Sequence, residues 1–239
     1  MLSIRVDELR KTIAGRPALD GLSAAFAPGT LHGLIGPDGA GKTTFLRLLA
    51  GLLRPSAGRI EYLRDGRPVP FDDVRPRLAY MPQTQSLYAD LSIGEHLEFF
   101  RDLHAVPQES YGPRRDRLLA LTRLAPFVDR PAGKLSGGMY KKLGLMCALI
   151  ASPEVLLLDE PTNGVDPVSR RDFWNLLYEL RDGGLLVLIA TAYMDEAERC
   201  DRVGVLDAGR WIANGPPRDL LEEAGAAGFA ELFIRRGTR

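Results

Sequence analysis

The sequence predicts an α/β protein in which a mostly parallel sheet is covered by helices on both faces. Two strand segments, VLLLD (155–159), which is apolar up to Asp159, and LLVLIA (185–190), are apolar runs that show no period-two alternation. Such runs are typical of parallel strands that are buried on both sides. Strands and helices alternate in the second half of the chain, and a strand-free helical stretch precedes them. We therefore predict one α/β core with a helical insert at roughly residues 86–150.

The composition is that of an ordinary globular protein. The 239 residues are 45% hydrophobic and 26% charged, with a formal net charge of zero. Such a balance argues against a surface that coats nucleic acid, and no direct DNA binding is expected. Cys147 and Cys200 lack metal-type spacing, and nothing suggests a disulfide framework, which fits a reducing compartment. The most apolar region, 143–158, is broken at 152–154, whereas a membrane span needs about 20 apolar residues. We expect contact with a membrane only through a partner.

The first third of the chain is predicted to be strand-rich. SIRVDEL, LSAAFA and LHGLIG read as short strands, with AGRPALDG and PGT as the turns between them. A helix is expected from about Lys42 to Leu53, where Arg54-Pro55 stops it. GRIEYL and RLAYM are two further strand candidates on either side of the turn-rich segment RDGRPVP.

The remaining elements follow from apolar periodicity. IGEHLEFFRDLHAV and RRDRLLALTRL are helical patterns between Ser92 and Leu124. Next come the strand 155–159, a helix over 167–182, the strand 185–190, a short helix MDEAERC and the strand RVGVLD. The tail from Pro216 is predicted to be helical.

A phosphate-binding loop is predicted where GPDGAGKT follows a strand and opens a helix. This segment, Gly36 to Thr43, matches G-x-x-x-x-G-K-[ST] at all eight positions. Its backbone N–H groups would point at phosphates, Lys42 would reach the β and γ phosphates, and the Thr43 hydroxyl would ligate Mg²⁺. A glycine-rich turn before an ordinary helix is the plainer alternative. The predicted nucleotide-binding residues here are Gly36, Pro37, Asp38, Gly39, Ala40, Gly41, Lys42, Thr43 and Thr44.

Two carboxylates follow the buried strand 155–159. Asp159 comes after four apolar residues, where nucleotide triphosphatases place the carboxylate that holds Mg²⁺. Glu160, one residue further on, could orient or deprotonate an attacking water. The alternative is an acidic turn at a strand end before Pro161.

A second anion site is predicted in KLSGGMYKKLGL (134–145). Ser136 is well placed as the N-cap of a helix, so free backbone N–H groups and the positive end of the helix dipole face outward. Such a helix end attracts phosphate. A helix cap without a ligand is the alternative.

These motifs together resemble the nucleotide-binding domains of ATP-binding-cassette (ABC) proteins. The segments 36–43, 135–139 and 156–160 stand in the order found in that family, and the resemblance covers nearly the whole chain. It implies a P-loop NTPase core with a mostly parallel sheet, an N-terminal antiparallel β subdomain and a helical insert subdomain. Residues 1–239 would form one domain, with 1–85 and 151–239 as the core.

The resemblance also explains why one chain carries two phosphate sites. In the family two domains pair head to tail, and the LSGG helix start of each completes the ATP site of the other. The signature residues implied to act in trans are Leu135, Ser136, Gly137, Gly138 and Met139, of which Ser136, Gly137 and Gly138 would contact the γ-phosphate.

Two further positions carry over by motif. Gln83 in YMPQ resembles the Q-loop glutamine, which senses Mg²⁺ and links the site to the helical insert. With Lys42 and Glu160 it is implied to be catalytic, and with Thr43 and Asp159 to form the metal site. Gln85 is a rival for this role, and an uncharged loop glutamine is the alternative. Asp166 in NGVDP resembles the D-loop aspartate at the dimer interface and is equally suited to cap the helix at Pro167.

Four positions depart from the family pattern. Ala192 stands where the family places a histidine that contacts the γ-phosphate; losing one such contact can cost ~10²–10³ in rate, so a slowed enzyme is expected. Ile13 occupies the position of the aromatic residue that stacks on adenine, and can pack against the base without stacking. Asp38 and Met139 replace the more common asparagine and glutamine.

The resemblance implies an ATP- and Mg²⁺-dependent motor of a membrane exporter. YMDEAE, NGVDP and LSGGM look like the ATPases of drug-type ABC-2 exporters, and Ala192 with DPVSRRDFW looks like ribosome-associated or efflux-like cassettes. The expected partners are a second ABC domain and a membrane permease, at the cytoplasmic face of the inner (plasma) membrane. A soluble ATPase acting on ribosomes and a regulatory cassette in a heterodimer remain the alternatives.

Overall fold

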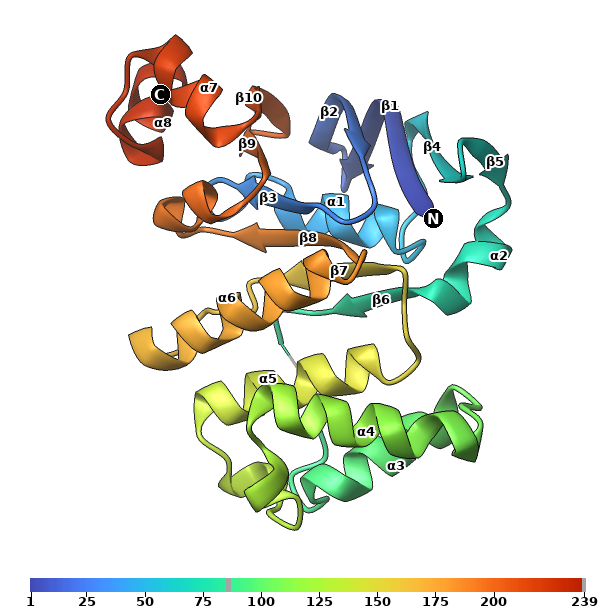
Figure 1. Cartoon of the computed structure of the whole chain (residues 1–239). Helices are drawn as coiled ribbons and strands as arrows, with labels where there is room; N and C mark the ends of the chain where they lie inside the picture. The colour runs from blue at the N-terminus through green and yellow to red at the C-terminus, as the bar shows by residue number, and fades with distance from the viewer. Residues whose placement is uncertain (85–86, 238–239) are drawn as a thin grey trace.

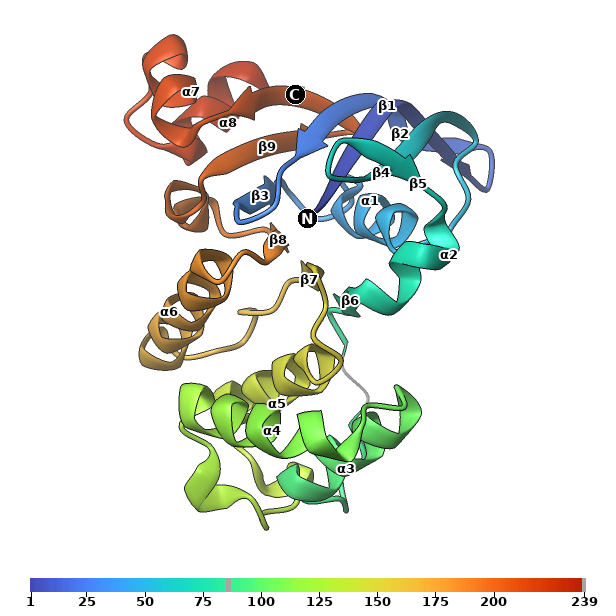
Figure 2. The ribbon, with the colours of Figure 1, turned by 45° about the vertical axis from the view of Figure 1, so that its right-hand side comes forward.

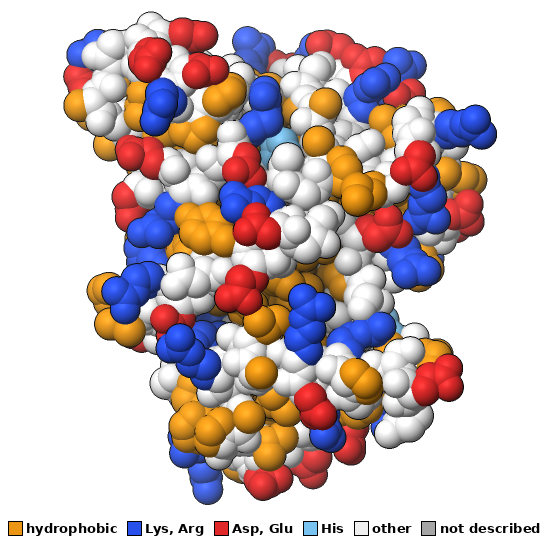
Figure 3. Space-filling view, in the orientation of Figure 1, with side chains coloured by type: hydrophobic (Ala, Val, Ile, Leu, Met, Phe, Trp, Pro, Cys, Tyr) orange, Lys and Arg blue, Asp and Glu red, His pale blue; other side chains and the backbone are white. Residues whose placement is uncertain are grey.

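The computed structural model describes residues 1–84 and 87–237 and divides into three layers of structure. Figure 1 shows a small β sheet at the top right, a larger sheet with its helices in the middle, and a group of helices below. After a 45° rotation, Figure 2 shows the group of helices still below the larger sheet. Basic and acidic side chains are interspersed over the face shown in Figure 3, in keeping with the zero net charge.

The smaller sheet is antiparallel, with the strand order β2-β1-β4-β5. Its strands are β1 (Leu2–Ile13), β2 (Arg16–Phe26), β4 (Ala57–Arg64) and β5 (Arg67–Val69). The two N-terminal strands are much longer than predicted, because the turn between them is only Ala14–Gly15, with φ of 48° and 77°. Bulges between Val6 and Leu9 and again near Thr12 interrupt the side-chain alternation that would have revealed the full strand.

The larger sheet has six strands in the order β10-β9-β3-β8-β7-β6. They are β3 (Leu31–Ile35), β6 (Leu78–Met81), β7 (Val155–Asp159), β8 (Leu186–Thr191), β9 (Arg202–Asp207) and β10 (Arg210–Gly215). All neighbouring pairs are parallel except β9 with β10. The predicted α/β class with a mostly parallel sheet and an antiparallel β subdomain is confirmed.

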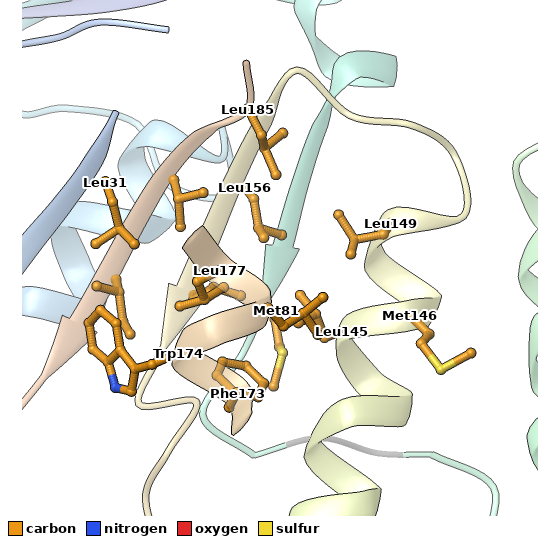
Figure 4. Close-up of a cluster of buried hydrophobic side chains, with 14 of the residues drawn as sticks. Leu31, Met81, Leu145, Met146, Leu149, Leu156, Phe173, Trp174, Leu177 and Leu185 are labelled. Carbon is orange, nitrogen blue, oxygen red and sulfur yellow. The ribbon is translucent and has the colours of Figure 1, made fainter. Parts of the chain in front are cut away.

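The middle strands are buried on both faces, which explains their continuous apolar runs. Alternate β7 residues belong to two different cores: Val155 and Leu157 pack with the α1 side, and Leu156 and Leu158 pack with the α5 and α6 side. Figure 4 shows the second core filling the space between helices and sheet. Its labelled side chains are Leu31, Met81, Leu145, Met146, Leu149, Leu156, Phe173, Trp174, Leu177 and Leu185.

The helices lie on both sides of the sheet and in the lower group. They are α1 (Lys42–Leu49), α2 (Phe71–Val74), α3 (Ile93–Leu103), α4 (Gln108–Thr122), α5 (Gly137–Leu149), α6 (Pro167–Asp182), α7 (Pro217–Ala224) and α8 (Phe229–Arg236). The described residues also form the 3₁₀ turns η1 (Arg75–Arg77), η2 (Ala125–Phe127), η3 (Ala132–Lys134) and η4 (Met194–Arg199). Helices α3, α4 and α5 form the lower group in Figures 1 and 2.

Several predicted helices differ from the structure in their bounds or type. Helix α1 stops at Leu49 rather than Leu53, because Gly51 takes a φ of 68° and its backbone turns away. Helix α4 begins earlier than predicted, at Gln108, and accommodates Pro113 in its interior. The predicted short helix after β8 is the 3₁₀ turn η4. Among residues 1–84 and 87–237, no helix combines the length and apolarity needed to cross a bilayer.

Candidate functional site

The loop between β3 and α1 is shaped by two glycines that have no space for a side chain. A Cβ on Gly36 would lie 2.1 Å from the carbonyl oxygen of Leu206, and one on Gly41 would lie 2.6 Å from that of Ala18. Gly41 also has a φ of 110°, which disfavours any other residue. The loop is therefore held between β2 and β9. It borders a cavity of about 330 Å³ lined by Ala18, Asp38, Gly39, Gly41, Lys42, Thr43, Thr44, Gln83 and Glu160.

Lys42 points its ammonium group back into this loop. Its Nζ donates hydrogen bonds to the carbonyl oxygens of Gly36 at 2.7 Å and Pro37 at 3.1 Å, and lies 3.4 Å from Oε1 of Glu160. The side chain is only 6% exposed. A buried cation at the centre of a glycine-rich loop at a helix N-terminus is suited to an anionic phosphate group.

Asp159 ends β7 beside the first turn of α1. The Thr43 hydroxyl donates to Asp159 Oδ1 at 3.0 Å, and the Tyr80 hydroxyl donates to Oδ2 at 3.1 Å. A hydroxyl and a carboxylate thus converge from two elements at one edge of the cavity. Oxygen donors of this kind are those that Mg²⁺ prefers.

Gln83 also lines the cavity, with Thr43, and adds an amide oxygen to the hydroxyl of Thr43 and the carboxylate of Asp159 as a candidate metal ligand. The parts of the chain that the structure describes contain no group of three or more His, Cys, Asp or Glu side chains able to hold a metal alone. The residues fit Mg²⁺ as Thr43, Asp159 and Gln83 with phosphate and water completing the shell, which is how Mg²⁺ is usually bound.

Glu160 adopts an unusual backbone conformation, with a φ of 49°. Its N–H donates to the Ala190 carbonyl at 2.8 Å, and its Oε2 accepts from the Ala192 N–H at 3.2 Å. Burial raises the pKa of the Glu160 carboxyl, although the nearby Lys42 opposes that shift. A carboxylate with a raised pKa that lines the cavity is equipped to accept a proton from water.

The backbone carbonyl of Gln83 accepts a hydrogen bond from the helical group. Lys141 of α5 donates from Nζ to this oxygen at 3.1 Å. The structure therefore places Gln83 at the cavity and ties it to the helical group. Its rival Gln85 lies outside the described residues.

The LSGG segment opens α5, away from the cavity. The Ser136 Oγ accepts from the Met139 N–H at 3.3 Å, which makes Ser136 the N-cap as predicted. Ser136 and Gly137 are exposed, whereas Gly138 is buried, and a Cβ there would lie 2.6 Å from the Ser169 side chain. Leu135 and Met139 are partly buried against the core. The two phosphate-type sites therefore do not meet within one chain.

Asp166 caps helix α6. Its Oδ1 accepts from the N–H groups of Val168 at 3.1 Å and Ser169 at 2.9 Å. The side-chain hydrogen bond with Ser169 is the main cause that lowers the pKa of the Asp166 carboxyl, and the N–H groups of Ser169 and Val168 lower it further. The capping role is present, and the carboxylate lies on the segment that runs beside the start of α5, where a Cβ on Gly137 would lie 3.6 Å from the Gly164 carbonyl.

Of the positions that depart from the family pattern, Ala192 and Asp38 lie at the site, whereas Ile13 lies outside the cavity. Ala192 contacts the site through its backbone N–H alone, on Glu160. Asp38 is exposed and lines the cavity. Ile13, at the hairpin tip, is 47% exposed and is not among the residues that line the cavity.

Sequence reasoning missed two side chains of the site. Tyr80, the next-to-last residue of β6, is the first residue of the YMPQ motif, which was used only for its glutamine. Lys141 approaches from a helix that is distant in sequence, and no local pattern signals that contact.

The segments described above are those of one protein family. The family described as ABC transporter matches residues 19–163 of the chain. This protein belongs to the ABC transporter family. The resemblance inferred from the motifs is confirmed, and with it the identification of the chain as an ATP-binding domain of the drug-exporter type.

Individual relatives with similar sequences or structures support the same family assignment. The probable multidrug ABC transporter ATP-binding protein YbhF of Escherichia coli (strain K12) is 42% identical over 99% of this chain, which spans 41% of that protein's length. The daunorubicin resistance ATP-binding protein DrrA3 of Streptomyces coeruleorubidus is 42% identical over 93% of this chain and 71% of its own length. A solved ATP-binding subunit of an ABC transporter superposes with a TM-score of 0.85 at 28% identity, covering 98% of this chain and 99% of that one.

Proposed function

We propose that this ABC domain binds and hydrolyses ATP and that the hydrolysis drives export through a membrane partner. The observation that carries this proposal is the convergence of Lys42, Thr43, Gln83 and Glu160 on one cavity, with Asp159 hydrogen-bonded to Thr43 at its edge. These are the groups that phosphoryl transfer to water requires: a cation for the phosphates, ligands for a metal, and a base for the water.

Nucleotide binding would use contacts that Lys42 now makes within the chain. The β and γ phosphates would replace the Gly36 and Pro37 carbonyls as partners of the ammonium, and the backbone N–H groups at the start of α1 would add further donors. Mg²⁺, held by Thr43, Asp159 and Gln83, would neutralise charge on the phosphate oxygens.

Glu160 would act on the attacking water. Its carboxylate is oriented by the Ala192 N–H and lies beside Lys42, so it is positioned before substrate arrives. The side chain of Ala192 offers no donor to the γ-phosphate. We therefore expect turnover that is slower than in a domain with a histidine there, by up to ~10²–10³.

Two copies of the chain would be needed for a complete site. The start of α5 is exposed and carries free N–H groups, but it lies outside the cavity of its own chain. A head-to-tail dimer would bring Ser136 and Gly137 of one copy to the γ-phosphate in the other. Asp166, on the neighbouring segment, would lie at that interface.

The membrane partner would dock on the helical group. Tyr88, Phe99 and Leu103 are exposed large hydrophobic residues, at 56%, 39% and 63%. They lie near a groove of about 320 Å³ to which Leu87, Phe100 and Cys147 contribute. An apolar surface of this kind suits a helix from a permease, which would hold the chain at the cytoplasmic face of the inner (plasma) membrane.

A regulatory role in a heterodimer is the second candidate. Ala192 and Ile13 favour it, because both remove side chains that the family uses at the nucleotide. The intact arrangement of Lys42, Asp159 and Glu160 argues for hydrolysis.

Steady-state ATP turnover by the isolated chain over a wide range of protein concentration separates the two candidates. Turnover that rises faster than linearly, and is lost in Glu160→Gln, is expected for two copies that assemble working sites. ATP binding without turnover at any concentration would instead support the regulatory role.

A further inference from the structure

Three consecutive residues of α5 contact two parts of the chain, the residues after β6 and helix α6. The Tyr140 hydroxyl accepts from the Leu87 N–H at 3.1 Å. Lys141 Nζ donates to the Gln83 carbonyl at 3.1 Å, and Lys142 Nζ pairs with Asp172 Oδ2 of α6 at 3.5 Å. The first two contacts are made to Leu87 and Gln83, whereas the third is made to helix α6.

The surroundings of Lys141 differ from those of an ordinary surface lysine. The side chain is half-buried, and burial lowers the pKa of its ammonium, while the carboxylates of Glu160 and Asp159 act in the opposite direction. Its cation thus lies within the field of the two carboxylates of the cavity. Its one hydrogen bond in the described structure is to the Gln83 backbone.

We propose that Lys141 is a positioning residue that fixes Gln83 at the chain's own nucleotide site and joins that site to the helix start facing the partner's nucleotide. The inference rests on the proposed function and adds a residue to it. Helix α5 is continuous from Gly137 to Leu149. Lys141 and Ser136 are five positions apart, about 7.5 Å along the helix axis, so a shift at Gln83 is transmitted to Ser136 by a rigid element.

The consequence for binding follows from where the hydrogen bond lies. With its carbonyl held, Gln83 presents its amide side chain to the cavity in fewer conformations, and less ordering is needed when Mg²⁺ arrives. The P-loop contacts of Lys42 do not involve Lys141. Loss of the bond should therefore weaken the part of ATP binding that depends on Mg²⁺ and leave the rest unchanged.

The test compares the ATP dissociation constant with Mg²⁺ and with EDTA, by calorimetry, for Lys141→Met, Lys141→Arg and the neighbouring control Lys142→Met. Methionine keeps the apolar stem and removes the donor. In Lys141→Met the gain in affinity on adding Mg²⁺ should shrink about fivefold, with the EDTA value unchanged. Lys141→Arg should restore the gain, and Lys142→Met should keep it. Lys141→Gln, which is shorter and neutral, should repeat the loss without relying on the packing of methionine.

Each other outcome overturns the inference. An unchanged Mg²⁺ gain in Lys141→Met would show that Gln83 needs no support. Equal weakening with Mg²⁺ and with EDTA would show that Lys141 acts as a charge on the phosphates. Absence of ATP binding in the wild-type chain would overturn the proposed function itself, and so is distinguishable from a failure confined to the variants.

Discussion

The two phosphate-type sites of this chain are both helix starts, yet they differ in how complete they are. At α1, a buried lysine, two carboxylates and a closely packed glycine loop surround one cavity. At α5, Ser136 caps its own helix and Gly137 is exposed. The first site contains groups for binding and for chemistry. The second offers only backbone donors and a hydroxyl.

This difference supports the proposal that the second site acts only together with a partner. A helix N-terminus gives weak, unselective attraction for anions when nothing else surrounds it. The N–H groups at α5 become specific only when another surface brings the phosphate to them. We therefore propose that the α1 site binds nucleotide in one chain and that the α5 site acts only in a pair.

The largest effect is expected at α1, from Lys42→Met. The variant removes the buried ammonium and should weaken ATP binding by about 100-fold, the upper range for a hydrogen bond to a charged group, and abolish turnover. Calorimetry and phosphate release measure both. Retention of tight ATP binding would mean that the backbone N–H groups of the loop are sufficient for binding. The α1 site would then not differ from the α5 site in needing a buried cation.

The next largest effect is expected at α5, from Ser136→Arg. Turnover should fall ~10²–10³, as for removal of one transition-state donor, while ATP binding by the single chain changes less than about twofold. Gly112→Arg is the matched control, since a side chain there enters open space on the neighbouring helix α4. A comparable loss of ATP binding in Ser136→Arg would show that the two sites meet within one chain.

His32 lies on β3, the strand that precedes the α1 site, and is expected to make the free energy of unfolding fall at acid pH. This residue is buried, its Nε2 lies 2.8 Å from Thr30 Oγ1, and its pKa is lowered to about 4, mainly by burial and further by Arg202. The unfolded chain binds this proton near pH 6.5, so stability falls as the pH drops from 6.5 to 4. The loss by pH 5 should be about 2 kcal/mol.

Urea unfolding of wild type and His32→Gln at pH 7.5 and pH 5 measures this loss. The glutamine variant should lose less stability over the same interval. If both chains lost the same amount, the dependence would come from other groups, and β3 would not be the acid-sensitive support of the first site.

The smallest change in activity is expected from Ala192→His. A histidine would offer the γ-phosphate a side-chain donor that alanine does not have, and turnover should rise about tenfold, less than the ~10²–10³ of a fully positioned donor. Ala192→Gln serves as a control for side-chain size. Lower turnover in the histidine variant would indicate that the Ala192 N–H contact to Glu160 is disturbed and that this site works by a different arrangement.

The sequence was most informative where one local rule determines the structure. The helix over Pro167–Asp182 has the predicted bounds, because a capping aspartate followed by a proline marks its start. The strand over Arg202–Asp207 also has the predicted bounds, because a charged residue stands at each end. The strands β1 and β2 were underestimated because their bulges conceal the alternation. Strands β5 and β10 were missed because they depend on pairing with a neighbour.

At the site, too, the residues that are contiguous in sequence were predicted, and those brought in by tertiary contacts were not. Gly36 to Thr43 lie together in sequence and in space. Tyr80 and Lys141 reach Asp159 and Gln83 only through tertiary packing, which no spacing in the sequence encodes.

The measurement that tests most directly whether two chains build each site is complementation between two inactive variants. Lys42→Met lacks a working first site, and Ser136→Arg lacks a working second one. In their mixed dimer, one site combines the intact α1 loop of one chain with the intact α5 start of the other. An equimolar mixture should recover about a quarter of wild-type turnover, since half of randomly formed dimers are mixed and each has one intact site of two. A mixture no more active than its two components, beside an active wild type, would contradict the head-to-tail account.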